Sequence, residues 1–341
     1  MLCKIMIVGE AWGEQEERMQ SPFVGPTGYE LWRMLSEANI KRSECYVTNV
    51  FNLRPKPTND IENLCCSPKP TITGSLPALS RGKYLRPEFL PQVQRLYSDV
   101  QRVRPNIIIA LGNTACWALL LTTGISKLRG AITVTAAPEA NGTKILPTYH
   151  PSAVCREWSL RPVTVLDFCK ARRESEYPEI RRPERTVYIE PSLSDMEWFY
   201  DRHLVHCESI SFDIETAGDQ ITCIGFAPNP ETALVIPFCD PRKPGGSYWD
   251  NPQEEEEAWR FVRRVLAMPQ PKSGQNGLYD ITFLWRGYGI TVTNYDEDTM
   301  LLHHALQPES PKGLGFLGSV YTNEASWKLM RKGKETIKRE D

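Results

Sequence analysis

The sequence predicts an α/β protein with two domains, each with its own sheet. The chain has 341 residues, which is more than one hydrophobic core usually serves. Its front part alternates apolar strands with amphipathic helices, a pattern typical of a mostly parallel sheet. Its rear part has three strands in succession and then helices. Residues 174–186, rich in charge and proline, predict a linker between domains 1–173 and 187–341.

The elements of the front domain follow from its apolar spacing. Residues 54–87, rich in Pro, Asn, Ser, Gly and Thr, predict a long surface loop. Ligands of parallel sheets gather where the strands end, and the unusual turns of this domain fall at such ends. These turns are Gly9–Gly13, Asn49, Gly112–Asn113 and His150. The expected strands are residues 5–8, 46–50, 106–111 and 144–147, and the expected helices are residues 28–38, 89–104 and 114–121.

The rear domain has a different pattern. Its three successive strands are joined by short polar links, so they predict an antiparallel meander. Helical spacing follows in three segments. The expected strands are residues 209–216, 221–227 and 233–238, and the expected helices are about residues 254–267, 278–288 and 298–306.

Composition excludes several classes of protein. No apolar run reaches the roughly 18 residues of a membrane helix, so no membrane partner is expected. Ten cysteines without a C-x-x-C pair predict reduced thiols in the cytoplasm rather than a disulfide scaffold. Residues 1–176 carry a net charge of +6 and residues 177–341 one of −8. The basic part suits an anionic partner such as nucleic acid, but chance and an acidic helix start at Glu254–Glu257 also explain the asymmetry.

A glycine-flanked acidic motif, G-E-A-W-G-E-Q-E-E, follows the first strand. It fits a phosphate loop poorly, because no Lys follows and acids dominate. Taken alone, an acidic helix N-terminus explains it better. Four further signals follow in order: Phe23 in S-P-F-V-G-P-T-G, Asn49 at a strand end, L-G-N-T-A at Leu111, and His150 in H-P-S.

In this order the five motifs resemble the uracil-DNA glycosylase superfamily, over about residues 4–172. The likeness is greatest to its family-four branch and to the version fused to some phage DNA polymerases. It implies a three-layer domain that flips uracil out of DNA and hydrolyses its N-glycosidic bond. We expect no cofactor for this reaction here, because this chain departs from the family pattern in its cysteines. An amide such as Asn49 can donate to one uracil edge atom and accept from another, which cytosine reverses. A His near the departing base stabilises its negative charge, and a carboxylate or an oriented water serves the sugar cation.

The resemblance also implies roles for residues at the matching positions. The catalytic residues would be Glu10, His150 and Glu14, with Glu16 and Glu17 as acidic neighbours. Uracil would be bound by Phe23, Asn49, Ala11 and Gly9. The DNA backbone would be contacted by Gly112, Asn113, Thr114 and Ser152. The wedge, the residue that enters the base stack when the uracil leaves it, would be Ala153 or Val154.

The chain also departs from the family-four pattern. Trp12 stands where Pro is usual, and Glu17 where Asp is usual. The family binds a four-iron cluster through four cysteines, but here only Cys3 precedes the first motif and Leu53 replaces the cysteine before Arg-Pro. We therefore expect no iron–sulfur cluster.

Two acidic residues share one face of a rear-domain strand. In I-S-F-D-I-E-T, the period of two places Asp213 and Glu215 side by side. Adjacent carboxylates repel each other unless a divalent cation lies between them, so either a metal site or a solvated acidic face fits the pattern. A third carboxylate, Asp280, comes early in a predicted helix.

From about residue 186 onward the chain resembles the 3′–5′ exonuclease domain of family A DNA polymerases, an RNase-H-like fold. The motifs are F-D-I-E-T, N-x-x-x-D, D-T-M-L-x-x-x-x-L-x-P-E and G-L-x-x-L. The resemblance implies Mg²⁺ or Mn²⁺ on Asp213, Glu215 and Asp280, with Asp298 in a supporting role. The family's fourth Asp follows a Tyr by four residues, but Ala325 stands four residues after Tyr321. We therefore expect a chain that stops before this motif and has weak or no nuclease activity.

The sequence thus favours an enzyme that excises uracil from single- or double-stranded DNA, with an appended exonuclease-like domain. A separate DNA polymerase chain is a candidate partner, and the cytoplasm of a bacterium or of a phage-infected host is the expected location. Two alternatives remain at this stage: a non-catalytic DNA-binding accessory subunit and an N-terminal fragment of a phage-type polymerase.

Overall fold

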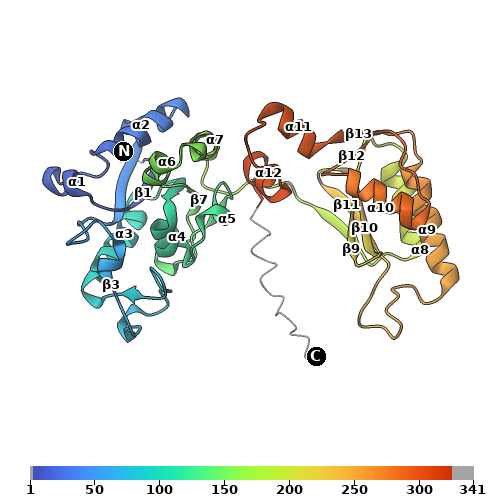
Figure 1. Cartoon of the computed structure of the whole chain (residues 1–341), viewed down its shortest axis with the longest axis horizontal. Helices are drawn as coiled ribbons and strands as arrows, with labels where there is room; N and C mark the ends of the chain where they lie inside the picture. Colours follow the sequence, from blue (N-terminus) through green and yellow to red (C-terminus); the bar gives the residue numbers. More distant parts are fainter. Residues whose placement is uncertain (1–2, 325–341) are drawn as a thin grey trace. The chain divides into compact units, whose positions relative to one another are not determined.

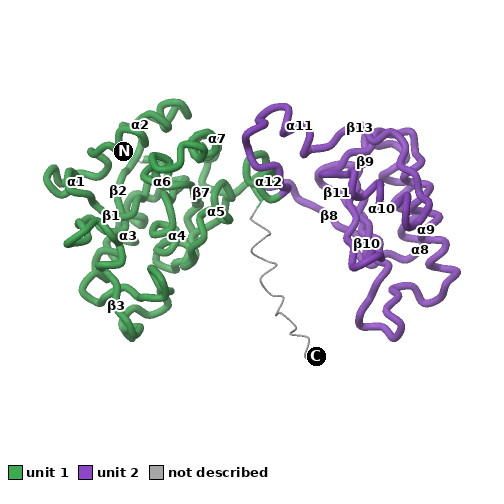
Figure 2. The backbone as a smooth tube through the Cα atoms, viewed as in Figure 1, with its two compact units in different colours: residues 1–181, 315–341 green, residues 182–314 purple. Residues whose placement is uncertain are grey.

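The structure, a computed structural model, describes residues 3–324. These residues form two compact units, one of residues 3–181 with 315–324 and one of residues 182–314 (Figure 2). Each unit has its own mixed or parallel sheet with helices, which confirms the predicted α/β class. No helix in the described part of the chain is long and apolar enough to cross a membrane.

The first unit is built on a five-stranded sheet in the order β2-β1-β5-β7-β6. Figure 1 labels two of these strands, β1 and β7, and the helices around them. The first four strands are mutually parallel, and β6 pairs antiparallel to β7. A small hairpin, β3-β4, lies within the predicted loop of residues 54–87. The strands are β1 (Ile5–Ala11), β2 (Cys45–Phe51), β3 (Cys65–Cys66), β4 (Tyr84–Leu85), β5 (Ile107–Leu111), β6 (Thr133–Val134) and β7 (Lys144–Thr148).

Helices cover both faces of this sheet. In β1, Ile5 and Ile7 enter one hydrophobic core while Met6 and Val8 enter another, so the strand is apolar throughout. Helices α2 and α7 complete the first core, and α3 and α4 complete the second. This confirms the three-layer prediction. The helices are α1 (Glu14–Met19), α2 (Pro26–Glu37), α3 (Leu90–Val103), α4 (Gly112–Leu120), α5 (Ile125–Leu128), α6 (Pro151–Arg156) and α7 (Arg161–Glu174).

The second unit has a six-stranded sheet in the order β13-β12-β9-β10-β11-β8. The antiparallel meander β9-β10-β11 is confirmed, and β12 and β13 extend it in parallel beside β9, as in an RNase-H-like fold. The strands are β8 (Thr186–Ile189), β9 (Ile210–Ala217), β10 (Gln220–Asn229), β11 (Thr232–Pro237), β12 (Lys272–Gly274) and β13 (Tyr295–Asp298). The helices are α8 (Leu193–Phe199), α9 (Pro252–Leu266), α10 (Leu278–Tyr288) and α11 (Thr299–Leu306), and a π-helical turn (Tyr200–Leu204) follows α8.

The last described helix, α12 (Leu314–Tyr321), belongs to the first unit. The sequence placed it in the second domain, within residues 187–341. Instead, the buried Lys170 ammonium of α7 donates to the carbonyl of Ser319 at 2.8 Å and to that of Thr322. The second unit is therefore an insertion in the sequence of the first.

We predict that Lys170→Met lowers the free energy of unfolding of the first unit by about 2–3 kcal/mol, because buried carbonyls would lose a charged donor. The same ammonium also donates to the Gly130 carbonyl at 2.7 Å. Lys127→Met, on an exposed site of α5, is the matched control. Denaturant titration followed by tryptophan fluorescence measures both variants. Equal stability of the two would show that Lys170 does not hold α12 in place.

Candidate active site

A cavity of about 510 Å³ opens in the first unit where β1, β2, β5 and β7 end. Parallel strands bring their carboxyl ends to one edge of the sheet, so residues far apart in sequence meet there. Of the residues proposed from the sequence, Glu10, Ala11, Phe23, Asn49, Gly112, Asn113, His150, Ser152 and Ala153 line this cavity.

Gly9 forms the support behind the cavity rather than part of its lining. A Cβ at this position would lie 2.2 Å from Asn49 Oδ1 and 2.5 Å from Phe23 Cζ. Only glycine permits this approach, because any side chain would displace both groups. Gly9, predicted to bind uracil, therefore acts by allowing Asn49 and Phe23 to approach its backbone.

Phe23 is held in an uncommon backbone conformation. Its φ of 53° lies in the left-handed region, which is costly for a bulky residue. The Trp32 indole donates to the Phe23 carbonyl at 3.2 Å, and Gly28 leaves space for the same carbonyl. The ring is buried and lies 6.1 Å from the His150 ring, centroid to centroid. Backbone strain at a cavity wall is typical of a ligand-binding position.

The Asn49 side chain faces the cavity from the end of β2. Its backbone is bonded on both sides, since its N–H donates to Asn52 Oδ1 at 3.3 Å and its carbonyl accepts from Arg95. No protein group within residues 3–324 bonds to its side-chain amide. The amide is therefore available to a ligand, with both a donor and an acceptor.

Glu10 is a cavity carboxylate with a single strong partner. The Thr114 hydroxyl donates to Glu10 Oε2, and burial raises the pKa of Glu10 despite that hydrogen bond. Thr114 itself is buried and does not line the cavity. The structure therefore corrects its predicted contact with the DNA backbone: Thr114 orients Glu10.

His150 presents one ring nitrogen to its own helix. It is the N-cap of α6, and its Nδ1 accepts from the Ser152 N–H at 3.2 Å. Burial lowers the pKa of His150 to about 4, so the ring is neutral near pH 7. Nδ1 also lies 2.8 Å from Ser152 Oγ, and in the tautomer in which Nδ1 accepts from both Ser152 groups the proton is on Nε2, which makes that nitrogen a donor. Gly112 allows the ring to approach, since a Cβ there would lie 3.0 Å from His150 Cβ.

The remaining backbone-contact and wedge candidates divide into two groups. Ser152 and Ala153 line the cavity at the start of α6. Asn113 also lines it, but its side-chain oxygen already accepts from the Gly124 and Ile125 N–H groups. Val154 is fully buried in the core and so does not serve as a wedge.

Two of the three acidic residues in the first turn of α1 have different roles. Glu14 is exposed and lies outside the cavity, with Arg54 at 3.9 Å, so its predicted catalytic role lacks structural support. Glu16 is buried, and its carboxylate accepts from the N–H of Gly13 at 3.2 Å and of Gly25 at 2.9 Å. Glu16 therefore ties together the two glycine turns that border the cavity.

Sequence reasoning missed several lining residues. The buried Trp12 Nε1 has no hydrogen-bond partner among the described residues. Asn59 belongs to the long loop predicted at residues 54–87, so this loop contributes to the cavity lining. Arg156 follows Ser152 by four residues on α6, a helical spacing that the sequence already contained. The missed residues are Trp12, Gly13, Thr27, Asn59, Ile125, Tyr149 and Arg156, and Glu16, expected as an acidic neighbour of the catalytic residues, also lines the cavity.

In the second unit, three proposed metal ligands lie near one another. Asp213 and Glu215 share the solvent face of β9, and Asp280 Oδ1 accepts from the Ile214 N–H at 2.9 Å. Partial burial and the charges of Asp280 and Glu215 raise the pKa of Asp213 to about 6.

In this structure the three carboxylates are not drawn together around one point. Within residues 3–324, no three His, Cys, Asp or Glu side chains are placed to hold a metal ion. Asp298 accepts from the N–H groups of Asn276, Gly277 and Met300 and from the Tyr295 hydroxyl, which fits its predicted supporting role. The binding of Mg²⁺ or Mn²⁺ by Asp213, Glu215 and Asp280 stays a prediction from the sequence, and Ala325 lies outside the described residues.

The cysteines of the first unit also form no ligand group among the described residues. Burial raises the pKa of the Cys65 thiol to about 11, so it is a thiol and not a metal-binding thiolate near neutral pH. The absence of an iron–sulfur cluster stays a prediction from the sequence.

Comparison with known proteins gives matches for the first unit. The model of the uracil DNA glycosylase superfamily matches residues 2–173. The type-4 uracil-DNA glycosylase of Thermotoga maritima is 31% identical over 173 residues, 50% of this chain and 76% of the relative. Those of Sulfurisphaera tokodaii and Archaeoglobus fulgidus are 30% and 31% identical, over 52% and 49% of this chain and 72% and 75% of the relatives.

Solved structures of exonucleases are also similar to part of this chain. The Aedes aegypti Nibbler EXO domain aligns with a TM-score of 0.33 at 14% identity, over 47% of this chain and 81% of that domain. Escherichia coli RNase D aligns with a TM-score of 0.31 at 14% identity, over 42% of this chain and 34% of that protein.

We predict that Glu16→Gln lowers the free energy of unfolding by about 1–3 kcal/mol, because one of the two glycine N–H groups would face an amide N–H₂ instead of an oxygen. Glu14→Gln on the same helix is the control, since that side chain is exposed. Hydrogen exchange of the Gly13 and Gly25 amides should accelerate only in Glu16→Gln. Unchanged exchange at both amides would exclude the bridging role.

Proposed function

Because the chain belongs to the uracil-DNA glycosylase superfamily, we propose that its first unit excises uracil from DNA by hydrolysing the N-glycosidic bond. The observation that carries this proposal is the single cavity shared by Glu10, Phe23, Asn49 and His150. Its DNA partner would supply the base by extrusion from the stack. A purely DNA-binding subunit would not need a carboxylate and a neutral imidazole in the same buried cavity.

Two residues would recognise the base. The Phe23 ring would support one face of uracil by stacking. The unpaired Asn49 amide would donate to a uracil carbonyl and accept from the ring N–H, and cytosine would present the opposite pattern. Buried polar groups that are left unpaired by the wrong base give strong discrimination.

Two other residues would serve the chemistry. As the bond breaks, negative charge develops on the base, and the His150 Nε2–H is the donor that would stabilise it. Glu10, oriented by Thr114 and raised in pKa, would position or deprotonate the water that attacks the sugar. Ser152 and Arg156, at the cavity rim, would contact the DNA backbone.

The test is excision of uracil from an oligonucleotide, measured in EDTA by alkaline cleavage of the abasic product. We expect wild-type activity, a loss of about a hundredfold or more in His150→Ala through removal of one oxyanion donor, and a comparable loss in Asn49→Asp. His206→Ala and Asn141→Asp, both at exposed sites, should keep wild-type rates. A wild-type protein that binds uracil-DNA but leaves it intact would support the accessory-subunit alternative.

For the second unit we propose a DNA-contacting role without rapid nuclease activity. The support is that Ala325 stands four residues after Tyr321, where the resemblance implies the fourth Asp of the exonuclease site. With Mg²⁺ or Mn²⁺, we expect digestion of 3′-labelled single-stranded DNA to stay well below the roughly 1 s⁻¹ lower end of typical kcat values. Asp213→Asn and the control Asp219→Asn should behave alike. Rapid digestion that only Asp213→Asn abolishes would show a complete nuclease site.

A further inference from the structure

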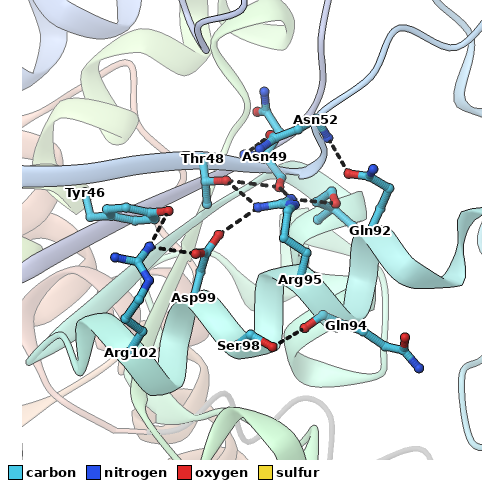
Figure 3. Close-up of polar contacts among 11 residues, drawn as sticks. Tyr46, Thr48, Asn49, Asn52, Gln92, Gln94, Arg95, Ser98, Asp99 and Arg102 are labelled. Carbon is cyan, nitrogen blue, oxygen red and sulfur yellow. Dashed lines mark hydrogen bonds and ion pairs between the residues drawn. The ribbon is translucent and has the colours of Figure 1, made fainter.

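Asn49, the residue proposed to recognise the base, lies on β2, the edge strand of the first sheet. Among residues 3–324, β2 is the outermost strand and pairs only with β1, so no described strand lies on the other side of its backbone. Unpaired backbone groups at such an edge need other partners. At the cavity end of β2 these partners come from α3, which packs beside the strand (Figure 3).

Arg95 of α3 is the main partner. Its Nη2 donates to the carbonyl of Asn49 at 2.6 Å and to that of Val50 at 3.2 Å. Its Nη1 donates to Thr48 Oγ1 at 3.0 Å. One planar guanidinium therefore holds three successive residues of β2, a geometry that a Lys ammonium does not reproduce.

The guanidinium is itself fixed in place. Asp99, one turn later on α3, accepts from Arg95 Nη1 at 2.8 Å and from Arg102 at 2.7 Å. Gln92, one turn earlier, accepts from the Asn52 N–H at 3.1 Å, and Asn52 in turn accepts from the Asn49 N–H. Figure 3 shows the resulting chain of contacts from α3 to both backbone groups of Asn49.

Arg95 does not line the cavity, so it would not contact a base bound there. We propose that Arg95 is a positioning residue, which fixes the Asn49 peptide so that the side-chain amide meets uracil in the correct orientation. This inference rests on the proposed function. Recognition by an amide requires its donor and acceptor to be held within roughly 0.5 Å, because a rotated amide loses both hydrogen bonds. An unrestrained edge strand would not hold them there.

The experiment compares Arg95→Met and Arg95→Lys with Arg102→Met in the full chain. Arg102 shares Asp99 but is largely exposed and makes no contact with the β2 carbonyls. Single-turnover excision should fall by about tenfold to a hundredfold in Arg95→Met, with unchanged affinity for uracil-free DNA. Arg95→Lys, which retains the charge, should fall by less. Inhibition by free uracil should weaken by the same factor as excision, while Arg102→Met matches wild type.

The outcomes separate the two proposals. An active wild type in which Arg95→Met and Arg95→Lys retain wild-type inhibition by uracil would overturn the positioning role alone, even if stability falls. Should Arg95→Met fail to fold, Arg95→Lys decides in the same assay. If the wild-type protein neither excises uracil nor binds free uracil, both the proposed function and this inference are wrong.

Discussion

The close approach of Phe23 and Asn49 to the backbone of Gly9 is the contact on which the cavity depends. It exists only because position 9 has no side chain, and it brings Phe23 and Asn49 together in the lining of the cavity. The neighbouring structure holds each residue from outside: Trp32 bonds the Phe23 carbonyl, and Arg95 bonds the Asn49 carbonyl. Precision at this site thus comes from groups that never reach the cavity.

Much of this architecture was predictable because parallel strands buried on both faces are apolar throughout and end in unusual turns. That pattern located Glu10, Asn49 and His150 at one sheet edge. It did not distinguish Glu14 from Glu16, since both are acidic residues near one helix start and only the helical phase decides which is buried. It also gave no sign of Arg95, because a polar position on an amphipathic helix ordinarily faces water.

The second unit shows the limit of strand patterns more clearly. Alternation correctly placed Asp213 and Glu215 on one face of β9. Whether further carboxylates complete a site depends on the short strands β12 and β13, which lack a period that sequence reasoning can use. Likewise, the apolar residues of α12 predict a packed helix, but not which surface it covers.

Because α12 packs with the first unit, the order of synthesis affects how that unit folds. The second unit precedes α12 in the sequence, so the ribosome synthesises it before α12. Until α12 is made, Lys170 lacks the carbonyl of Ser319 as a hydrogen-bond acceptor. Closing a loop of that length costs little more than closing a short one, because the entropy grows only with the logarithm of loop length. The delay is nevertheless real in time. During translation the nascent first unit exposes the surface that α12 later covers.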